Sequence, residues 1–302
     1  MITDVTRARG TGMTGTKTLL VGDDGSAGAG RAVDWACELA AALDDDLVAL
    51  RVIGDRDDAT ALIGELEHRC AGPAESLGVA CACRVVTGDA RHVLERAVLE
   101  SDAEAAVVGD AAHWRMARPH LGSVAGHLAH HSARPVVVVP DPDRGASRPG
   151  AVCVGRLVVG VDGSAGSEVA LAWAAGLASR AGASVLAAHF HDPLADSYPH
   201  PEEGVEWRSH DEPEVRAMVQ READHGVDID LTFRGAHRVE GLLDLAEEVD
   251  AAMIVVGARG HASLHHVLLG GTAMELLHHS HRPVGVVPNE RDVVPAGWEP
   301  VQ

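Results

Sequence analysis

The chain has 302 residues, of which 46% are hydrophobic but only 3% are aromatic, so Ala, Val and Leu must build its cores. A chain of this length is expected to form two domains of ordinary size. The 45 acidic residues outnumber the 25 Lys and Arg residues and give a net charge of −20. This charge argues against a nucleic acid or an anionic membrane as a partner, because both require a basic surface. The sequence also contains no uninterrupted apolar run of transmembrane length.

Strand and helix patterns alternate through the first half of the chain. Residues 1–16 are rich in Thr and Gly and lack the apolar core of a signal peptide, so they are predicted to be a disordered tail. Short apolar runs predict strands over residues 18–21, 47–53, 80–86, 105–109 and 135–139. Helical patterns cover residues 29–42, 61–77, 91–100 and 124–131, the second of them interrupted near Pro73.

The second half repeats this alternation after a Pro- and Gly-rich linker at residues 142–156. Strands are predicted over residues 157–161, 184–190, 228–234, 252–257 and 284–287, and helices over residues 167–180, 212–225, 239–248 and 272–279. Val-rich strands without polar alternation indicate a parallel sheet covered on both faces. We therefore expect two tandem doubly wound, Rossmann-like α/β domains at residues 17–141 and 157–289, each with strand order 3-2-1-4-5, and a tail at residues 290–302.

An internal repeat relates the two halves. The segment LVGDDGS, which ends at Ser26, matches VVGVDGS, which ends at Ser164. Further matches join residues 107–109 to 255–257, 121–123 to 269–271, 130–132 to 278–280 and 134–136 to 282–284. The last strand of each half is an apolar edge that needs covering. We predict that these two strands pair with each other in an internal pseudo-dimer, and a homodimer of the whole chain is a further expectation.

Residues 254–272 carry the strongest candidate for a ligand site. A buried strand ends at Gly257, Gly260 follows, and Gly270 and Gly271 come before a helix that opens at Thr272. Glycines let backbone N–H groups approach an anion, and a helix N-terminus adds partial positive charge, so this pattern suits a phosphate. Asp162, Gly163 and Ser164 follow the first strand of the same half. If the two strands are neighbours, both loops line one crevice.

The VGVDGS segment, the Gly-x-x-Gly pair with a third glycine after nine residues, and the Arg-Pro-Val before the last strand together resemble the universal stress protein family. The resemblance covers about residues 17–140 and 157–288, which makes the chain similar to a tandem member. It implies a five-stranded parallel sheet and ATP, with Mg²⁺ as a candidate companion ion, bound in the crevice.

The resemblance also implies roles for residues of the second half. Asp162 and the main chain near Phe190 would contact the adenosine, and Gly257 would lie near the ribose. The phosphates would be wrapped by Gly260, Gly270, Gly271 and Thr272. Arg259 and His261 would either add positive charge or be solvated loop residues. The family has Ser or Thr directly after the third glycine, whereas this chain has Gly271 and then Thr272.

The first half keeps part of this pattern. Asp24 matches Asp162, and Gly109, Gly122 and Ser123 keep their spacing. Ala112 replaces the second glycine, and Asp110 places a negative charge where phosphates would pass. His113 offsets that charge only when it is protonated. We therefore expect ATP mainly in the second half.

Other constellations admit a second interpretation. Asp23 and Asp24 could hold Mg²⁺ or serve as a base, whereas Asp23, which replaces Val161 of the repeat, could simply cap a strand end. Ser26 and Ser164 fit helix caps better than nucleophiles. His127 and His131 share a helix face, but a polar helix edge is favoured over zinc. Cys81 and Cys83 would face one side of a strand as a metal or redox pair, yet small core side chains in a reducing compartment are favoured. We assign no metal ligand from the sequence.

These observations favour a cytoplasmic, ATP-binding stress-response protein that acts as a sensor or regulator. No catalytic residue is assigned, because no general base, metal cage or arginine finger is visible. One alternative is a slow ATPase or autokinase that uses Ser123 or Thr272 as the acceptor. Another is an interaction module that binds a different adenine nucleotide, such as cyclic AMP.

Overall fold

The computed structural model describes residues 4–9, 17–101, 103–110, 121–140, 155–191, 211–260 and 269–289. The described helices lack the combination of length and apolarity that crossing a membrane requires. The predictions made for Ala112, His113 and His261 concern residues that lie outside the described part of the chain.

The first half forms an α/β unit that closely follows the predicted ranges. Its strands are β2 (Thr18–Gly22), β3 (Asp46–Ile53), β4 (Cys81–Thr87), β5 (Ala105–Gly109) and β6 (Val136–Val139). Its helices are α1 (Ala27–Leu43), α2 (Ala59–Leu77), α3 (Ala90–Glu100) and α4 (Ser123–His131). Helix α2 runs without a break through Pro73, so the predicted interruption is wrong. Its buried side chains from Ile63 to Ala74 pack into the core on both sides of the proline, and this packing maintains the helix.

The second half repeats the same unit. Its strands are β7 (Arg156–Gly160), β8 (Ser184–His191), β9 (Ile229–Gly235), β10 (Met253–Gly257) and β11 (Val284–Val287). Its helices are α5 (Ala165–Ala181), α6 (Asp211–Ala223), α7 (Arg238–Glu248) and α8 (Gly271–His279). Ser26 and Ser164 cap α1 and α5 through their hydroxyl oxygens, which confirms the predicted capping role.

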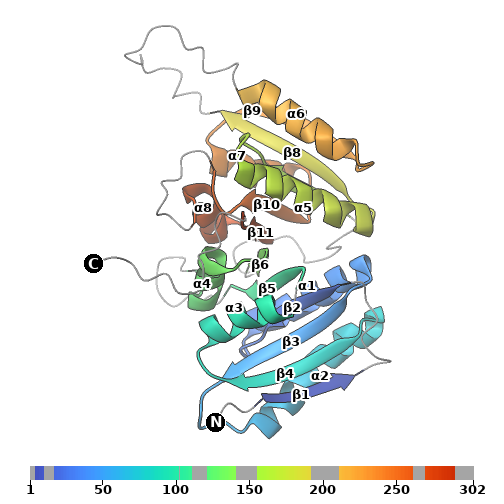
Figure 1. The fold of residues 1–302 in the computed structure, drawn as a ribbon, viewed down its shortest axis with the longest axis vertical. Coiled ribbons are helices and arrows are strands. Elements are labelled where there is room, and N and C mark those ends of the chain that lie inside the picture. Colours follow the sequence, from blue (N-terminus) through green and yellow to red (C-terminus); the bar gives the residue numbers. More distant parts are fainter. Residues whose placement is uncertain are drawn as a thin grey trace, which may run out of the picture.

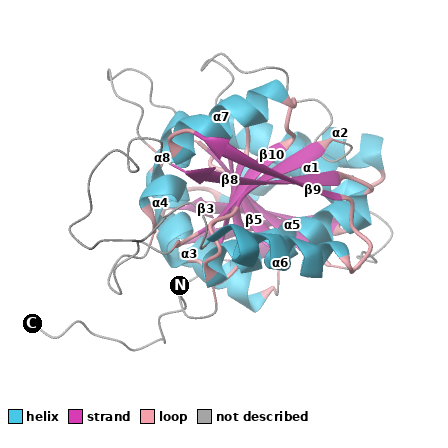
Figure 2. Cartoon of the chain, turned by 90° about the horizontal axis from the view of Figure 1, so that it is seen from above, coloured by secondary structure: helices cyan, strands magenta, loops and turns pink. Residues whose placement is uncertain are grey.

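The eleven strands of the described residues, which include β1 (Asp4–Arg9), belong to one continuous sheet ordered β1-β4-β3-β2-β5-β6-β11-β10-β7-β8-β9. Apart from β1, the strands of each half pair in parallel and follow the order 3-2-1-4-5, which confirms the predicted fold class. Figure 1 shows the two halves stacked along the long axis, and Figure 2 shows helices on both faces of the sheet.

The two halves join through their last strands. Strands β6 and β11 pair antiparallel, with Val137 opposite Gly285, so the predicted internal pseudo-dimer is confirmed. This pairing occupies both apolar edges inside one chain. The ends of the combined sheet are β1 and β9.

Strand β1 (Asp4–Arg9) overturns part of the predicted disordered tail. It pairs antiparallel with β4, and Arg7 lies opposite Cys83 in the register. The edge of β4 offers unpaired backbone groups, and a nearby chain segment satisfies them as an added strand. The Thr- and Gly-rich composition of residues 1–16 gave no sign of this pairing because the partner strand lies over 70 residues away.

The buried core forms two layers, one on each face of the sheet. Helices α1, α2, α5 and α6 cover one layer, and α3, α4, α7 and α8 cover the other. Central strands such as β3 and β6 are buried on both faces, as the Val-rich pattern predicts. The sheet is therefore a rigid support for the loops at its strand ends.

Candidate functional site

The loop after β7 forms one wall of the predicted crevice. Gly163 has φ +82°, which favours glycine, and it turns the chain into α5. The Oδ1 atom of Asp162 accepts hydrogen bonds from the Ser164 backbone N–H (3.0 Å) and the Ser164 hydroxyl (2.5 Å). Ser164 in turn caps α5 by accepting from the Ser167 backbone N–H at 3.2 Å. The three predicted residues therefore form one ordered turn.

The loop after β10 lies directly against this turn. Strands β7 and β10 are parallel neighbours, as the crevice requires. A Cβ atom on Gly257 would come within 2.6 Å of the Gly166 carbonyl, and one on Gly166 would lie 2.0 Å from the Arg259 carbonyl oxygen. A Cβ atom on Gly260 would lie 2.4 Å from Oδ2 of Asp162. Glycine is therefore needed on both sides of the contact, and the two loops meet through their main chains.

The start of α8 adds a third wall. Gly270 is its N-cap residue, with φ −73° and no side-chain cap. The Gly270 N–H donates to the Ala258 carbonyl at 2.7 Å, which ties the start of the helix to the loop after β10. A Cβ atom on Gly271 would meet nothing within 4 Å, and Gly271 is exposed. This helix end carries partial positive charge, and among the described residues no side chain caps it.

The end of β8 places Phe190 and a residue that the sequence analysis missed. The Phe190 ring packs on α7, because a Cβ atom on Gly241 would lie 2.3 Å from it. Only the main chain of Phe190 is therefore available to a ligand in the crevice. The neighbouring His189 hydrogen-bonds through Nδ1 to the Val161 carbonyl at 2.9 Å, and its ring lies edge-on to Phe233 at 5.7 Å. Alignment of the strands of the two repeats places His189 at the position of Arg51, and this correspondence could have identified His189 from the sequence.

The equivalent turn in the first domain is filled by charged side chains. Asp23 stands at the position of Val161, and its carboxylate is buried. It pairs with Arg51 at 2.8 Å and with Arg69 at 3.2 Å. Arg69 also donates to the carbonyls of Gly25 and Ser26, both at 2.7 Å. The guanidinium groups thus occupy the space beside the Asp-Gly-Ser turn, and Asp23 is an ion-pair partner and not a strand-end carboxylate open to Mg²⁺.

The remaining first-domain residues keep the backbone geometry of the repeat. Asp24 accepts from the Ser26 backbone N–H at 2.9 Å, as Asp162 does from Ser164. A Cβ atom on Gly109 would lie 2.4 Å from the Gly28 carbonyl oxygen. Gly122 and Ser123 begin α4 without a side-chain cap. Asp110 is only 1% exposed and replaces the buried Ala258 of the second domain.

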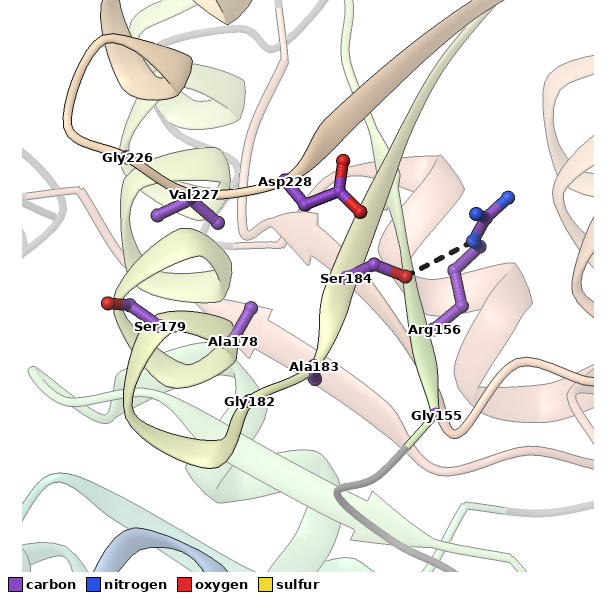
Figure 3. A pocket seen from close by; sticks show the side chains of 10 residues that line it. All are labelled: Gly155, Arg156, Ala178, Ser179, Gly182, Ala183, Ser184, Gly226, Val227 and Asp228. Carbon is purple, nitrogen blue, oxygen red and sulfur yellow. Dashed lines mark hydrogen bonds between the residues drawn. The ribbon is translucent and has the colours of Figure 1, made fainter.

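A polar pocket lies at the amino-terminal ends of the second domain's strands. Its lining residues precede or begin strands β7, β8 and β9, and Arg156 Nε donates to the Ser184 hydroxyl at 3.3 Å (Figure 3). Arg156 also pairs with Asp230 at 3.1 Å. Because the predicted site lies at the carboxyl ends of the strands, this pocket is separate from it.

Comparison with known proteins decides the family. The model of the universal stress protein family matches residues 15–140 and 154–288. The chain belongs to the universal stress protein family. Its two matches are the two repeated domains, so it is a tandem member, as the motifs predicted.

Several relatives of this universal stress protein are mycobacterial. A universal stress protein from Mycolicibacterium smegmatis is 35% identical over 140 residues, which cover 43% of this chain and 47% of that protein. The matched region thus spans about half of that relative. Universal stress protein Rv1996 from Mycobacterium tuberculosis is 29% identical over 248 residues, covering 78% and 74% of the two chains. The structure of a universal stress protein from Archaeoglobus fulgidus shares the fold, with a TM-score of 0.66 and 18% sequence identity. The match covers 90% of this chain and 98% of the Archaeoglobus chain.

Proposed function

We propose that this protein binds one ATP per chain in the crevice of the second domain and acts as a nucleotide-dependent regulator in a stress response. The observation that carries the proposal is the uncapped start of α8, joined by the Gly270–Ala258 hydrogen bond to a loop that touches Asp162. The carboxyl ends of β7 and β10 are the switch point of a doubly wound sheet, where ligands of this architecture bind.

The proposed phosphate end rests on backbone groups. The net charge of −20 disfavours anions over most of the surface, so a local source of positive potential is needed. The first turn of α8, from Gly271 and Thr272, supplies N–H groups and the helix dipole. Gly257 and Gly260 keep side chains out of the approach, and Arg259 is the cation within this loop.

The proposed adenosine end rests on Asp162 and the end of β8. Ser164 holds one carboxylate oxygen of Asp162, and the other lies against Gly260, which orients the group to accept from ligand hydroxyls. The Phe190 main chain and the His189 ring lie along the neighbouring strand. An anchored carboxylate in this setting is suited to binding and not to proton abstraction, so we propose a regulator without efficient turnover.

The preference for the second domain rests on the charges that fill the first. Two arginines and Asp23 surround the Asp-Gly-Ser turn of the first domain, where the second domain has Val161 and His189. The buried Asp110 adds a carboxylate beneath the loop that would face the phosphates. Opening this site would require breaking a buried ion pair, which costs several kcal/mol.

The test is an ATP titration by calorimetry of the wild type and of Gly270→Asp. Aspartate is a favoured N-cap residue and Gly270 has an ordinary φ, so α8 should keep or slightly gain stability, by a few tenths of a kcal/mol. The new carboxylate would stand where the phosphates bind, and we expect ATP affinity to fall by about 100-fold or more. Gly122→Asp makes the same change at the start of α4 and is the matched control, with ATP binding unchanged.

Other outcomes select the alternatives. Two ATP per chain would overturn the second-domain preference, and binding lost equally in both variants would do the same. If the folded protein does not bind ATP, the interaction module is favoured, and direct binding of cyclic AMP or another adenine nucleotide would identify its ligand. Steady phosphate release would favour the slow ATPase, and labelled protein after incubation with γ-labelled ATP would favour the autokinase.

A further inference from the structure

Three cysteine sulfurs converge inside the first domain, outside the nucleotide crevice. Cys70 comes from α2, and Cys81 and Cys83 come from β4. Their sulfur atoms all lie within 4.8 Å of one another, and the three side chains are 1%, 7% and 4% exposed. Cys37 of α1 is a fourth buried thiol in the same core layer.

The topology explains why these sulfurs meet. Cys81 and Cys83 are two residues apart in a strand, so both side chains leave the same face of the sheet. Helix α2 ends at Leu77. The chain then turns at Gly78, which has φ +71°, and continues directly into β4. The helix therefore packs back over the strand that follows it, and Cys70 faces the pair.

The second domain shows that this part of the core does not require cysteine. Strand pairing places Cys81 opposite Leu47 in the first domain and Ile229 opposite Val185 in the second. By this register Cys81 and Cys83 correspond to Ile229 and Leu231. Cys70 lies eleven residues before Cys81, and Met218 lies at the same spacing before Ile229, so these two correspond as well. The three apolar residues pack in the same layer. The same fold thus packs this position with apolar side chains in one repeat and with three thiols in the other.

Three mutually close sulfurs exceed what a disulfide needs. A disulfide joins two sulfurs at about 2.05 Å and leaves the third unused. Thiolate ligands select soft ions such as Zn²⁺ and Cu⁺. With metal–sulfur bonds of about 2.3 Å, tetrahedral geometry separates the sulfurs by about 3.8 Å, so the cluster would contract by roughly 1 Å or less. Among the described residues no His, Asp or Glu joins this cluster, so its ligand set is three thiol groups.

We propose that Cys70, Cys81 and Cys83 bind one thiophilic metal ion, Zn²⁺ or Cu⁺, as thiolate ligands inside the first domain. The ion displaces the protons of those thiols that are still protonated, so no oxidant or reductant is needed. Three sulfurs complete a trigonal set for Cu⁺, whereas they supply three of the four ligands that Zn²⁺ prefers. The site is independent of the nucleotide crevice.

The test titrates fully reduced, full-length protein anaerobically with Cu⁺ against a Cu⁺ chelator, and separately with Zn²⁺ against a zinc chelator. We expect one equivalent of either ion to be retained. In Cys70→Ala and Cys83→Ala we expect affinity to fall by roughly 100-fold or more, because each loses a ligand. Val85→Ala is the matched control, since Val85 is a buried residue of the same strand and the same core layer, and its loss should leave metal binding unchanged.

X-ray absorption of the metal-loaded wild type avoids any folding defect of the variants, and we expect a shell made of sulfur alone. Three results would overturn the proposal. The folded wild type could retain no metal, Cys70→Ala and Cys83→Ala could both retain metal as tightly as the wild type, or the bound metal could have a shell of nitrogen and oxygen. A mass 2 Da lower in the isolated protein, restored by reductant, would indicate a disulfide pair and also overturn it.

Discussion

At position 23 the first domain has a carboxylate where the second has the apolar Val161, and Arg51 stands where the second has His189. These two exchanges are coupled, because the Arg51 side chain is 5% exposed and requires a buried anion. The sequence alone suggested Mg²⁺ or a strand end for Asp23. The pairing partners lie 28 and 46 residues away, so their contact could not be inferred from local pattern.

We expect Asp23→Val to destabilise the first domain by about 3–5 kcal/mol, because it removes the buried partner of the Arg51 guanidinium and leaves it the largely exposed Glu65 carboxylate at 3.2 Å. The double variant Asp23→Val/Arg51→His installs the second-domain pair and should recover most of this loss. Urea unfolding of the two single variants and the double variant measures the coupling. A cost below about 1 kcal/mol for Asp23→Val would contradict a structural role for the pair.

Histidine side chains of α3 and α4 form a cluster in the first domain that the described part of the second domain lacks. His127 pairs with Glu95 at 2.8 Å and stacks on His131 with ring centroids 4.6 Å apart. His92 also lies edge-on to His127 at 5.3 Å. Burial lowers the pKa of His131, the charges of His127, His130 and His92 lower it further, and Glu95 opposes them. At the equivalent positions of α8, Glu275 replaces His127 and His279 corresponds to His131.

This arrangement predicts a pH dependence of stability. A pKa that is lower in the folded state means that the unfolded chain binds more protons as the pH falls below about 6.5. The stability that neutral His131 provides is therefore present above this pH and is lost as the pH falls toward the lowered pKa. We expect His131→Gln to flatten the pH dependence of the urea midpoint between about pH 5 and 7. The control His279→Gln should leave this pH dependence unchanged. If His131→Gln also leaves it unchanged, His131 is not its source.

At the scale of the whole molecule, the two domains are joined by more than the β6–β11 pair. Arg180 near the end of α5 donates to the Leu43 carbonyl at 2.8 Å and pairs with the buried Asp45 of the first domain. It also lies 3.5 Å from Glu104. One guanidinium of the second domain thus neutralises carboxylates at the end of α1, beside the helix terminus.

Arg180→Met should therefore uncouple the domains. We expect a loss of about 2–4 kcal/mol, because buried Asp45 loses its cationic partner, and scanning calorimetry should show two transitions where the wild type shows one. Arg234→Met removes an exposed Arg–Glu248 pair within the second domain and is the control, with a cost of about 1 kcal/mol or less. Equal effects of the two substitutions would contradict the interface role.

The alternation of strands and helices, the duplication, and the glycines that follow β7 and end β10 can be read from the sequence. These features are local or periodic, because side-chain period and turn conformation depend on neighbouring residues. The strand order was expected from the doubly wound architecture as a whole and not from a local pattern. Only the tertiary structure decided the pairing of β1, the Asp23–Arg51–Arg69 network, the convergence of three sulfurs and the meeting of α8 with the Asp162 turn. Each of these joins residues far apart in the chain, and the free energy that selects them comes from burial and hydrogen bonding that exist only after the sheet has formed.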